Sequence, residues 1–231
     1  MSEIEANVPT AQVVRPPPTS TQRIARLFAS RWSLFAVVGL LSLIADQATK
    51  IWARTSLPVH PEGCRIPEDI VARTCGGVAK PVIDGLWEWR LSMNPGSAFG
   101  LFSSQNSARI LLSVVGVAAV FGMVYMLRKA RPDQRILHWA LALVAGGAVG
   151  NLVDRIYYGV VTDFVLWKYK THEWPVFNVA DIVLVVGVGL MFIDIQKENK
   201  REKAEKGTKK QRRDKARAKA KADGLVKDLR D

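Results

Sequence analysis

The stretch EWPVFNVADIVLVVGVGLMFIDI, residues 173–195, determines the fold class of this chain. Most of it is apolar, and from position 176 onward it has the ~20 residues that a helix needs to cross the hydrocarbon core of a membrane. It also contains Asp181, and a carboxylate in such a segment is energetically costly and is usually retained for a functional reason. The stretch therefore predicts a transmembrane helix with a functional acidic residue near its start.

Three further apolar segments lie upstream, and each is again about as long as one membrane span. The segment ARILLSVVGVAAVFGMVYML has no polar stripe, which argues against the alternative of a soluble protein with buried helices. The sequence thus predicts an all-α integral membrane protein of four transmembrane helices, at about 33–53, 108–127, 136–153 and 176–195.

The distribution of Lys and Arg predicts the orientation of these helices. Basic residues precede the first span, separate the second span from the third, and outnumber acidic residues in the segment 197–231. The connection between the first two spans is balanced in charge. Because Lys and Arg collect on the cytoplasmic side of a membrane, we expect both termini in the cytoplasm and this connection outside.

Three parts are expected along the chain, whose formal net charge is +12. Residues 1–31, which include RPPPTS, predict a flexible cytoplasmic arm, and residues 32–196 predict the membrane domain. Residues 197–231 predict a basic cytoplasmic tail that is attracted to anionic membrane lipid. No specific nucleic-acid binding is expected, because no aromatic residue interrupts the basic tail to stack on bases.

The outer connection carries KPVIDGLWEWRLSMNPGSAFGLF, in which β-forming residues precede a turn. This pattern predicts a small extracytoplasmic β-sheet or loop cradle at the membrane surface, with Trp87 and Trp89 as interfacial anchors. Cys64 and Cys75 lie earlier in the same connection. An oxidising compartment permits a disulfide between them, and free thiols are the alternative interpretation.

Polar side chains collect in four clusters at the predicted outer ends of the spans: ADQATK, SMNPGSAFG, GGAVGNLVDRIYYGVVTDF and FNVAD. Asp46 and Lys50 in the first cluster are four residues apart, so they share a helix face and can pair. Asp154 has a basic neighbour in the sequence, but Asp163 and Asp181 have none. The last two are therefore the better candidates for chemistry, although spacing alone would allow either Asp154 or Asp163 as the partner of Asp181.

Two carboxylates that share one proton can hydrolyse a peptide bond, because the ionised group takes a proton from water while the neutral group donates to the carbonyl oxygen. Other hydrolytic designs are poorly supported: there is no H-E-x-x-H, no metal site is predicted, and Ser42 lies two turns from Lys50. A proton-coupled transporter would use the same carboxylates, but no pair of broken-helix repeats is visible.

The motifs DQATK, NPGSAFG, GGAVGNLVDR, VTDF and FNVAD follow one another in this order between residues 32 and 195. With them the chain resembles the lipoprotein signal peptidases (signal peptidase II), aspartic peptidases of the bacterial inner membrane. The resemblance implies an endopeptidase that cleaves diacylglyceryl-modified prolipoproteins before the lipidated cysteine, with Asp163 and Asp181 as the catalytic pair. It further implies that no cofactor is used, that globomycin-type compounds inhibit, and that the active site lies near the outer face.

Other positions are implied by the resemblance to support the structure or to contact substrate or inhibitor. They are Asp46, Lys50, Asn94, Gly96, Asn151, Asp154, Arg155, Asn178 and Ala180. We expect a monomer. The alternative function is a catalytically inactive relative that binds lipoprotein precursors or globomycin-like compounds, and the intact pair of aspartates argues against it. The outer loop and both termini are longer than the family pattern, so inhibitor sensitivity and any partner of the tail stay open.

Overall fold

The computed structural model describes residues 30–96 and 105–228, so most of the predicted N-terminal arm lies outside the described residues. Within these residues, four helices are long and apolar enough to cross a membrane, which confirms the prediction of an all-α multi-pass membrane protein. Their bounds are α2 (Arg31–Ser56), α4 (Gln105–Lys129), α5 (Arg135–Tyr157) and α6 (Val179–Asp228). A short helix, α3 (Glu68–Val71), lies in the connection between α2 and α4.

Helix α5 is the central helix of the bundle and contacts α2, α4 and α6. Its glycines permit this close approach. A Cβ atom added at Gly146 would lie 2.7 Å from the carbonyl oxygen of Gly39 in α2. One added at Gly147 would lie 2.7 Å from the carbonyl oxygen of Ala180 in α6. Small residues therefore bring three helix backbones together, as is common in membrane bundles.

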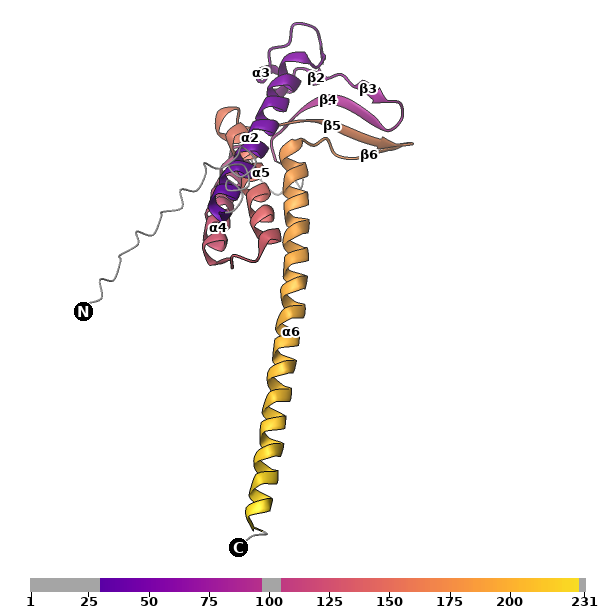
Figure 1. Cartoon of the computed structure of the whole chain (residues 1–231). Coiled ribbons are helices and arrows are strands. Elements are labelled where there is room, and N and C mark those ends of the chain that lie inside the picture. Colours follow the sequence, from indigo (N-terminus) through magenta and orange to yellow (C-terminus); the bar gives the residue numbers. More distant parts are fainter. Residues whose placement is uncertain (1–29, 97–104, 229–231) are drawn as a thin grey trace, which may run out of the picture.

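An antiparallel sheet lies at one end of the bundle and extends to one side of it (Figure 1). Its strand order is β3 (Lys80–Ile83), β4 (Trp87–Asn94), β5 (Val161–Tyr169) and β6 (His172–Glu173). Strand β5 follows α5 directly and pairs with β4, so that Asp163 lies opposite Ser92. A second, two-stranded sheet joins β1 (Val59–His60) to β2 (Gly76–Gly77). The predicted cradle is thus built from two distant parts of the chain.

The tryptophans of β4 pack against the core beneath the sheet, and their role as interfacial anchors stays a prediction. Trp87 and Trp89 are half-buried and meet edge to face, with ring centroids 4.7 Å apart, and Trp89 also packs on Phe164. Trp52 of α2 also meets Trp89 edge to face, with ring centroids 5.2 Å apart. Among the aromatic residues at the sheet end, the more exposed ones include Trp167, Tyr169 and Trp174.

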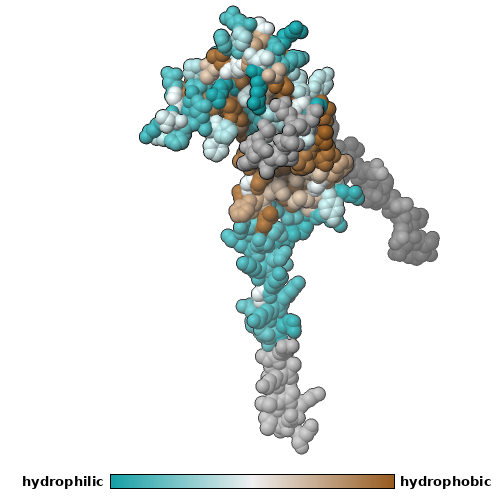
Figure 2. Space-filling model, turned by 180° about the vertical axis from the view of Figure 1, so that it is seen from behind, coloured by the Kyte–Doolittle hydropathy of each residue, from teal (hydrophilic) through white to brown (hydrophobic). Residues whose placement is uncertain are grey.

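Helix α6 begins three residues later than predicted, at Val179, and continues without a break into the basic segment (Figure 1). A hydrophobic zone around the bundle lies between the polar sheet end and the polar part of α6 (Figure 2). At the far end of the bundle, α6 is fastened to the turn between α4 and α5. Arg131 pairs with Glu198 at 2.6 Å and Arg201 with Asp133 at 2.7 Å, while Gln134 donates to Asp194 at 3.0 Å.

Candidate active site

The acidic residue at the start of α6 is part of a reciprocal helix cap. The side-chain oxygen of Asn178 accepts a hydrogen bond from the backbone N–H of Asp181 at 3.0 Å. In return, the backbone N–H of Asn178 donates to Oδ2 of Asp181 at 3.1 Å. This capping box satisfies backbone donors that a helix start leaves unpaired, and the positive end of the helix dipole favours an ionised carboxylate there. The helix start thus places Asp181 and leaves its Oδ1 for a partner outside the cap.

Asp163 lies on β5 and only 2% of its surface is exposed. Both of its oxygens accept hydrogen bonds from amides: Asn178 donates to Oδ1 at 2.6 Å and Asn94 donates to Oδ2 at 3.0 Å. Gly96 orients the second amide, because its N–H donates to the Asn94 oxygen at 2.8 Å and so turns the Asn94 nitrogen toward Asp163. Gly96 has a φ of +80°, a conformation that glycine adopts without strain.

Asn178 and Asn151 connect the two carboxylates. Asn178 contacts Asp163 through its side chain and Asp181 through its backbone. Asn151, on α5, donates to Oδ1 of Asp181 at 3.0 Å and accepts from Asn178 at 3.2 Å. Asp163 and Asp181 therefore share one hydrogen-bonded network. They lie 18 positions apart in the sequence, and this spacing alone did not establish that they pair.

The surroundings of Asp163 favour the neutral form of its carboxyl group. Burial, and then the nearby negative charge of Asp181, raise the pKa of Asp163 to about 7, while the Asn94 and Asn178 amides and the Lys50 charge act in the opposite direction. Asp163 thus keeps its proton to near neutral pH. Asp181 is only half-buried and has the helix start as a stabilising environment for negative charge. One neutral and one ionised carboxyl group is the arrangement that general acid and base catalysis requires.

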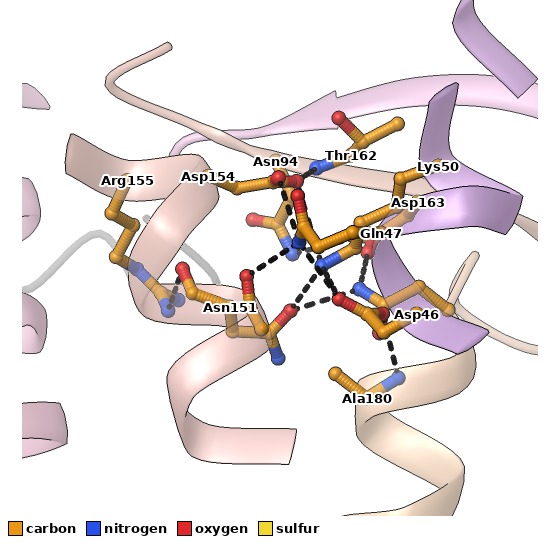
Figure 3. Close-up of polar contacts among 12 residues, drawn as sticks. Asp46, Gln47, Lys50, Asn94, Asn151, Asp154, Arg155, Thr162, Asp163 and Ala180 are labelled. Carbon is orange, nitrogen blue, oxygen red and sulfur yellow. Dashed lines mark hydrogen bonds and ion pairs between the residues drawn. The ribbon is translucent and has the colours of Figure 1, made fainter. Parts of the chain in front are cut away.

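A fully buried ion-pair cluster of Asp46, Lys50 and Asp154 lies beside Asp163 (Figure 3). The ammonium group of Lys50 lies 2.9 Å from Asp46 and 3.5 Å from Asp154, and it donates to Asn151 at 2.8 Å. Asp46 also accepts from the backbone N–H of Ala180 at 2.9 Å. The predicted pairing of Asp46 with Lys50 is confirmed, and the pair connects α2 to both α5 and the start of α6.

Asp154 is committed to structural contacts. It accepts from the backbone N–H of Thr162 at 2.8 Å, one residue before Asp163, and lies 3.7 Å from Arg54. Its cationic partners among the described residues are Lys50 and Arg54 rather than its sequence neighbour Arg155, which donates to the Asn151 backbone at 3.4 Å. Asp154 therefore fixes the start of β5 to the end of α5, and so positions the next residue along that strand.

Three residues of this cluster were missed by the sequence reasoning: Gln47, Arg54 and Thr162. Gln47 donates to Asp46 at 3.0 Å and to the backbone of Gly150 at 3.0 Å, and the Arg54 guanidinium donates to the Thr162 hydroxyl at 2.7 Å. Arg54 lies one helical turn after Lys50, and this spacing could have indicated it. In the described part of the chain, no group of three or more His, Cys, Asp or Glu is placed to hold a metal ion.

Comparison with known proteins gives concordant matches. Residues 38–197 match the protein-family model described as Signal peptidase (SPase) II. The chain is 34% identical over 171 residues to the lipoprotein signal peptidase of Geobacter metallireducens, an alignment that covers 74% of this chain and 95% of the relative. It is 34% identical over 165 residues to the lipoprotein signal peptidase of Xylella fastidiosa, covering 68% of this chain and 88% of that protein.

Solved structures support the fold. Two structures of bacterial membrane enzymes, both determined by the in meso method, superpose with TM-scores of 0.57 and 0.53 at 24% sequence identity. The first superposition covers 71% of this chain and 88% of the solved one, and the second covers 70% and 91%. The arrangement of four membrane helices with a small sheet at one end is therefore shared with these enzymes.

Proposed function

The chain belongs to the signal peptidase II family, and on this premise we propose that Asp163 and Asp181 are the catalytic pair with which it cleaves its substrates. Membership makes it an aspartic peptidase that acts on peptide bonds and removes signal peptides from lipoproteins. The proposal adds the residues, their roles and the cleavage site, which is the bond before the diacylglyceryl-modified cysteine. The observation that carries it is the hydrogen-bonded network through Asn178 and Asn151, which joins one buried carboxyl group to one at a helix start.

In the proposed mechanism, a water molecule lies between the two carboxyl groups and the scissile carbonyl. The ionised Asp181 accepts a proton from the water as its oxygen attacks the carbonyl carbon. The neutral Asp163 donates its proton toward the carbonyl oxygen, which stabilises the tetrahedral intermediate. When that intermediate collapses, the proton on Asp181 passes to the leaving amine. Asp163 recovers its proton from the hydroxyl group as the carbonyl reforms.

The remaining residues of the site have positioning roles in this proposal. Asn94 and Asn178 hold the Asp163 carboxyl group between two amides, and Asn151 holds Asp181. The buried cluster around Lys50 fixes the helix ends that carry them. Arg155 and Gly96 lie at the edge of this group, where a Cβ on Gly96 would come within 4.0 Å of the Arg155 guanidinium, and we assign them to contact with the substrate.

We further propose that the sheet end faces the outside of a bacterial inner membrane and that the far end of α6 lies in the cytoplasm. The excess of Lys and Arg in the tail supports this orientation. Lipid chains of the substrate would then stay in the bilayer while the scissile bond reaches the carboxylates at the outer interface. The proposal includes a monomeric enzyme that globomycin-type cyclic peptides inhibit by competing with the prolipoprotein.

The test is turnover of a diacylglyceryl prolipoprotein by the purified protein in detergent, with release of the signal peptide as the readout. Asp163→Asn and Asp181→Asn should each abolish release at unchanged protein yield. Asp84→Asn, which changes an exposed carboxylate in the turn between β3 and β4, is the matched control and should leave turnover unchanged. Turnover should also survive a metal chelator.

Release by Asp163→Asn at the wild-type rate would overturn the assignment of the pair, and loss of turnover in the chelator would overturn the mechanism. Wild-type protein that binds the prolipoprotein without cleaving it would favour the alternative of an inactive binding protein. Asp154→Asn separates structure from chemistry, since it should lower the thermal stability of the protein together with its activity.

A further inference from the structure

Both cysteines of the sequence lie in the connection between α2 and α4, and both are free thiols in the structure. Cys75 is buried and Cys64 is half-buried. Cys75 belongs to the hydrophobic core under the sheet, together with Ile70 of α3 and Leu91 of β4, and Cys64 packs against that core. The two side chains therefore border the same packed core.

A single residue fastens both cysteine-bearing segments. The carboxylate of Asp69, in α3, accepts a hydrogen bond from the backbone N–H of Arg65, which is the neighbour of Cys64. The backbone carbonyl of the same residue accepts from the N–H of Thr74 at 2.9 Å and from that of Cys75 at 3.4 Å. Asp69 thus holds the beginning and the end of this loop together.

The two thiols are also near enough to influence each other. Burial, and then the neighbouring Cys64 thiol, raise the pKa of the Cys75 thiol to about 11. Because a buried thiol stays protonated, the more accessible Cys64 is the one that meets an external oxidant first. The arrangement is that of a pair in which one thiol initiates exchange and the other completes it.

We propose that Cys64 and Cys75 form an intramolecular disulfide when their loop faces an oxidising compartment. The inference rests on the outward orientation proposed above and does not depend on the catalytic assignment. The oxidant is a disulfide of the outer compartment, R–S–S–R. The Cys64 thiolate attacks it and releases one R–SH, and Cys75 then attacks the mixed disulfide and releases the second. Together, Cys64 and Cys75 lose two protons and two electrons, and the two released R–SH molecules carry them.

The disulfide would fasten this loop onto the strand that leads to the candidate active site. Cys75 directly precedes β2, in which Gly77 packs so tightly on Leu91 of β4 that an added Cβ would clash with the Leu91 carbonyl oxygen. Strand β4 ends at Asn94, which donates to Asp163. Closing the loop therefore restrains the strand that positions the Asn94 amide.

The test begins with the purified, folded, reduced protein in detergent, treated with oxidised glutathione and then with a maleimide under denaturing conditions. We expect neither cysteine to be labelled, and both to be labelled after reduction. The matched controls are Cys64→Ser and Cys75→Ser. In each of them the remaining thiol should either react with the maleimide or carry glutathione. Oxidised wild-type protein should unfold at a higher temperature than reduced protein, whereas the double serine variant should not respond to oxidant. Labelling of both cysteines after the oxidant treatment would overturn the proposal.

The second arm uses protein trapped from cells with acid before labelling. A disulfide in this sample supports closure in the cell, and two free thiols would overturn it. The orientation is tested separately, by reducing intact cells that lack an outer membrane and adding a maleimide that cannot cross the inner membrane. Failure to label Cys64 in these cells would overturn the proposed orientation. A disulfide formed with oxidised glutathione in detergent would still show that Cys64 and Cys75 can pair.

Discussion

Raising the pH should inactivate this enzyme through Asp163, and removing the Asn94 amide should move the pH at which this happens. The general acid must carry a proton, and the pKa of Asp163 is raised to about 7 by burial and by the charge of Asp181. Above this value the neutral fraction of Asp163 falls tenfold for each pH unit, so kcat/KM should fall to about one tenth at pH 8 and about one hundredth at pH 9.

The Asn94→Ala variant gives the sharper test of the cause. The Asn94 amide donates to Asp163 at 3.0 Å and favours the ionised form, so its removal should raise the pKa of Asp163 further. A hydrogen bond to a charged group contributes about 1.5–3 kcal/mol, and 1.36 kcal/mol corresponds to one pKa unit. Part of this loss is recovered by water. We therefore expect the alkaline limb of the profile to move upward by about one pH unit.

The assay is the initial rate of signal-peptide release between pH 5 and pH 9 at low substrate concentration, with protein integrity checked at each pH. Gln134→Ala is the matched control, because it removes an amide that donates to Asp194 at the other end of the bundle. Its profile should coincide with that of the wild type. A rate that stays constant or rises between about pH 7 and pH 9, or an alkaline limb that moves downward in Asn94→Ala, would refute the assignment of Asp163 as the acid.

Further predictions concern the scaffold. Lys50→Met should leave Asp46 and Asp154 buried without their shared cation, at a cost of roughly 3–5 kcal/mol, and a thermal midpoint close to that of the wild type would contradict this. Gly147→Ala should force α5 and α6 apart, costing about 1–3 kcal/mol and lowering turnover. Gly122→Ala, in α4, meets no atom within 4 Å and should leave both the midpoint and turnover unchanged.

The four membrane helices could be predicted because each needs only a long apolar segment, a property of neighbouring residues. The capping box was also within reach, since Asn178 and Asp181 have the spacing that such a cap requires. The partners of Asp154 could not be predicted, because Arg54 and Thr162 lie on separate elements that meet only after the bundle and the sheet have formed. The end of α6 was missed for another reason: Lys, Glu and Ala favour a helix, so the change in composition at the membrane boundary does not interrupt it.

The relation between Asp154 and Asp163 illustrates the same limit. Spacing allowed either residue as the partner of Asp181, and only a resemblance to a family favoured Asp163. The contacts give a physical reason for that preference. Asp154 has Lys50 and Arg54 as cationic partners, whereas, within the described residues, the hydrogen bonds to the Asp163 carboxyl group come from amides. Its catalytic role remains a prediction.

The continuous helix α6 fixes the distance of Asp181 from the far end of the bundle. Its contacts with the turn between α4 and α5 set a fixed reference level at Glu198, and Asp181 lies 17 residues before that level, or about 25 Å along the helix axis. The number of residues between Asp181 and Glu198 therefore sets the level at which the Asp181 carboxylate meets a substrate. Inserting one residue between the two points would raise Asp181 by about 1.5 Å and turn it by about 100° around the axis, away from Asn151.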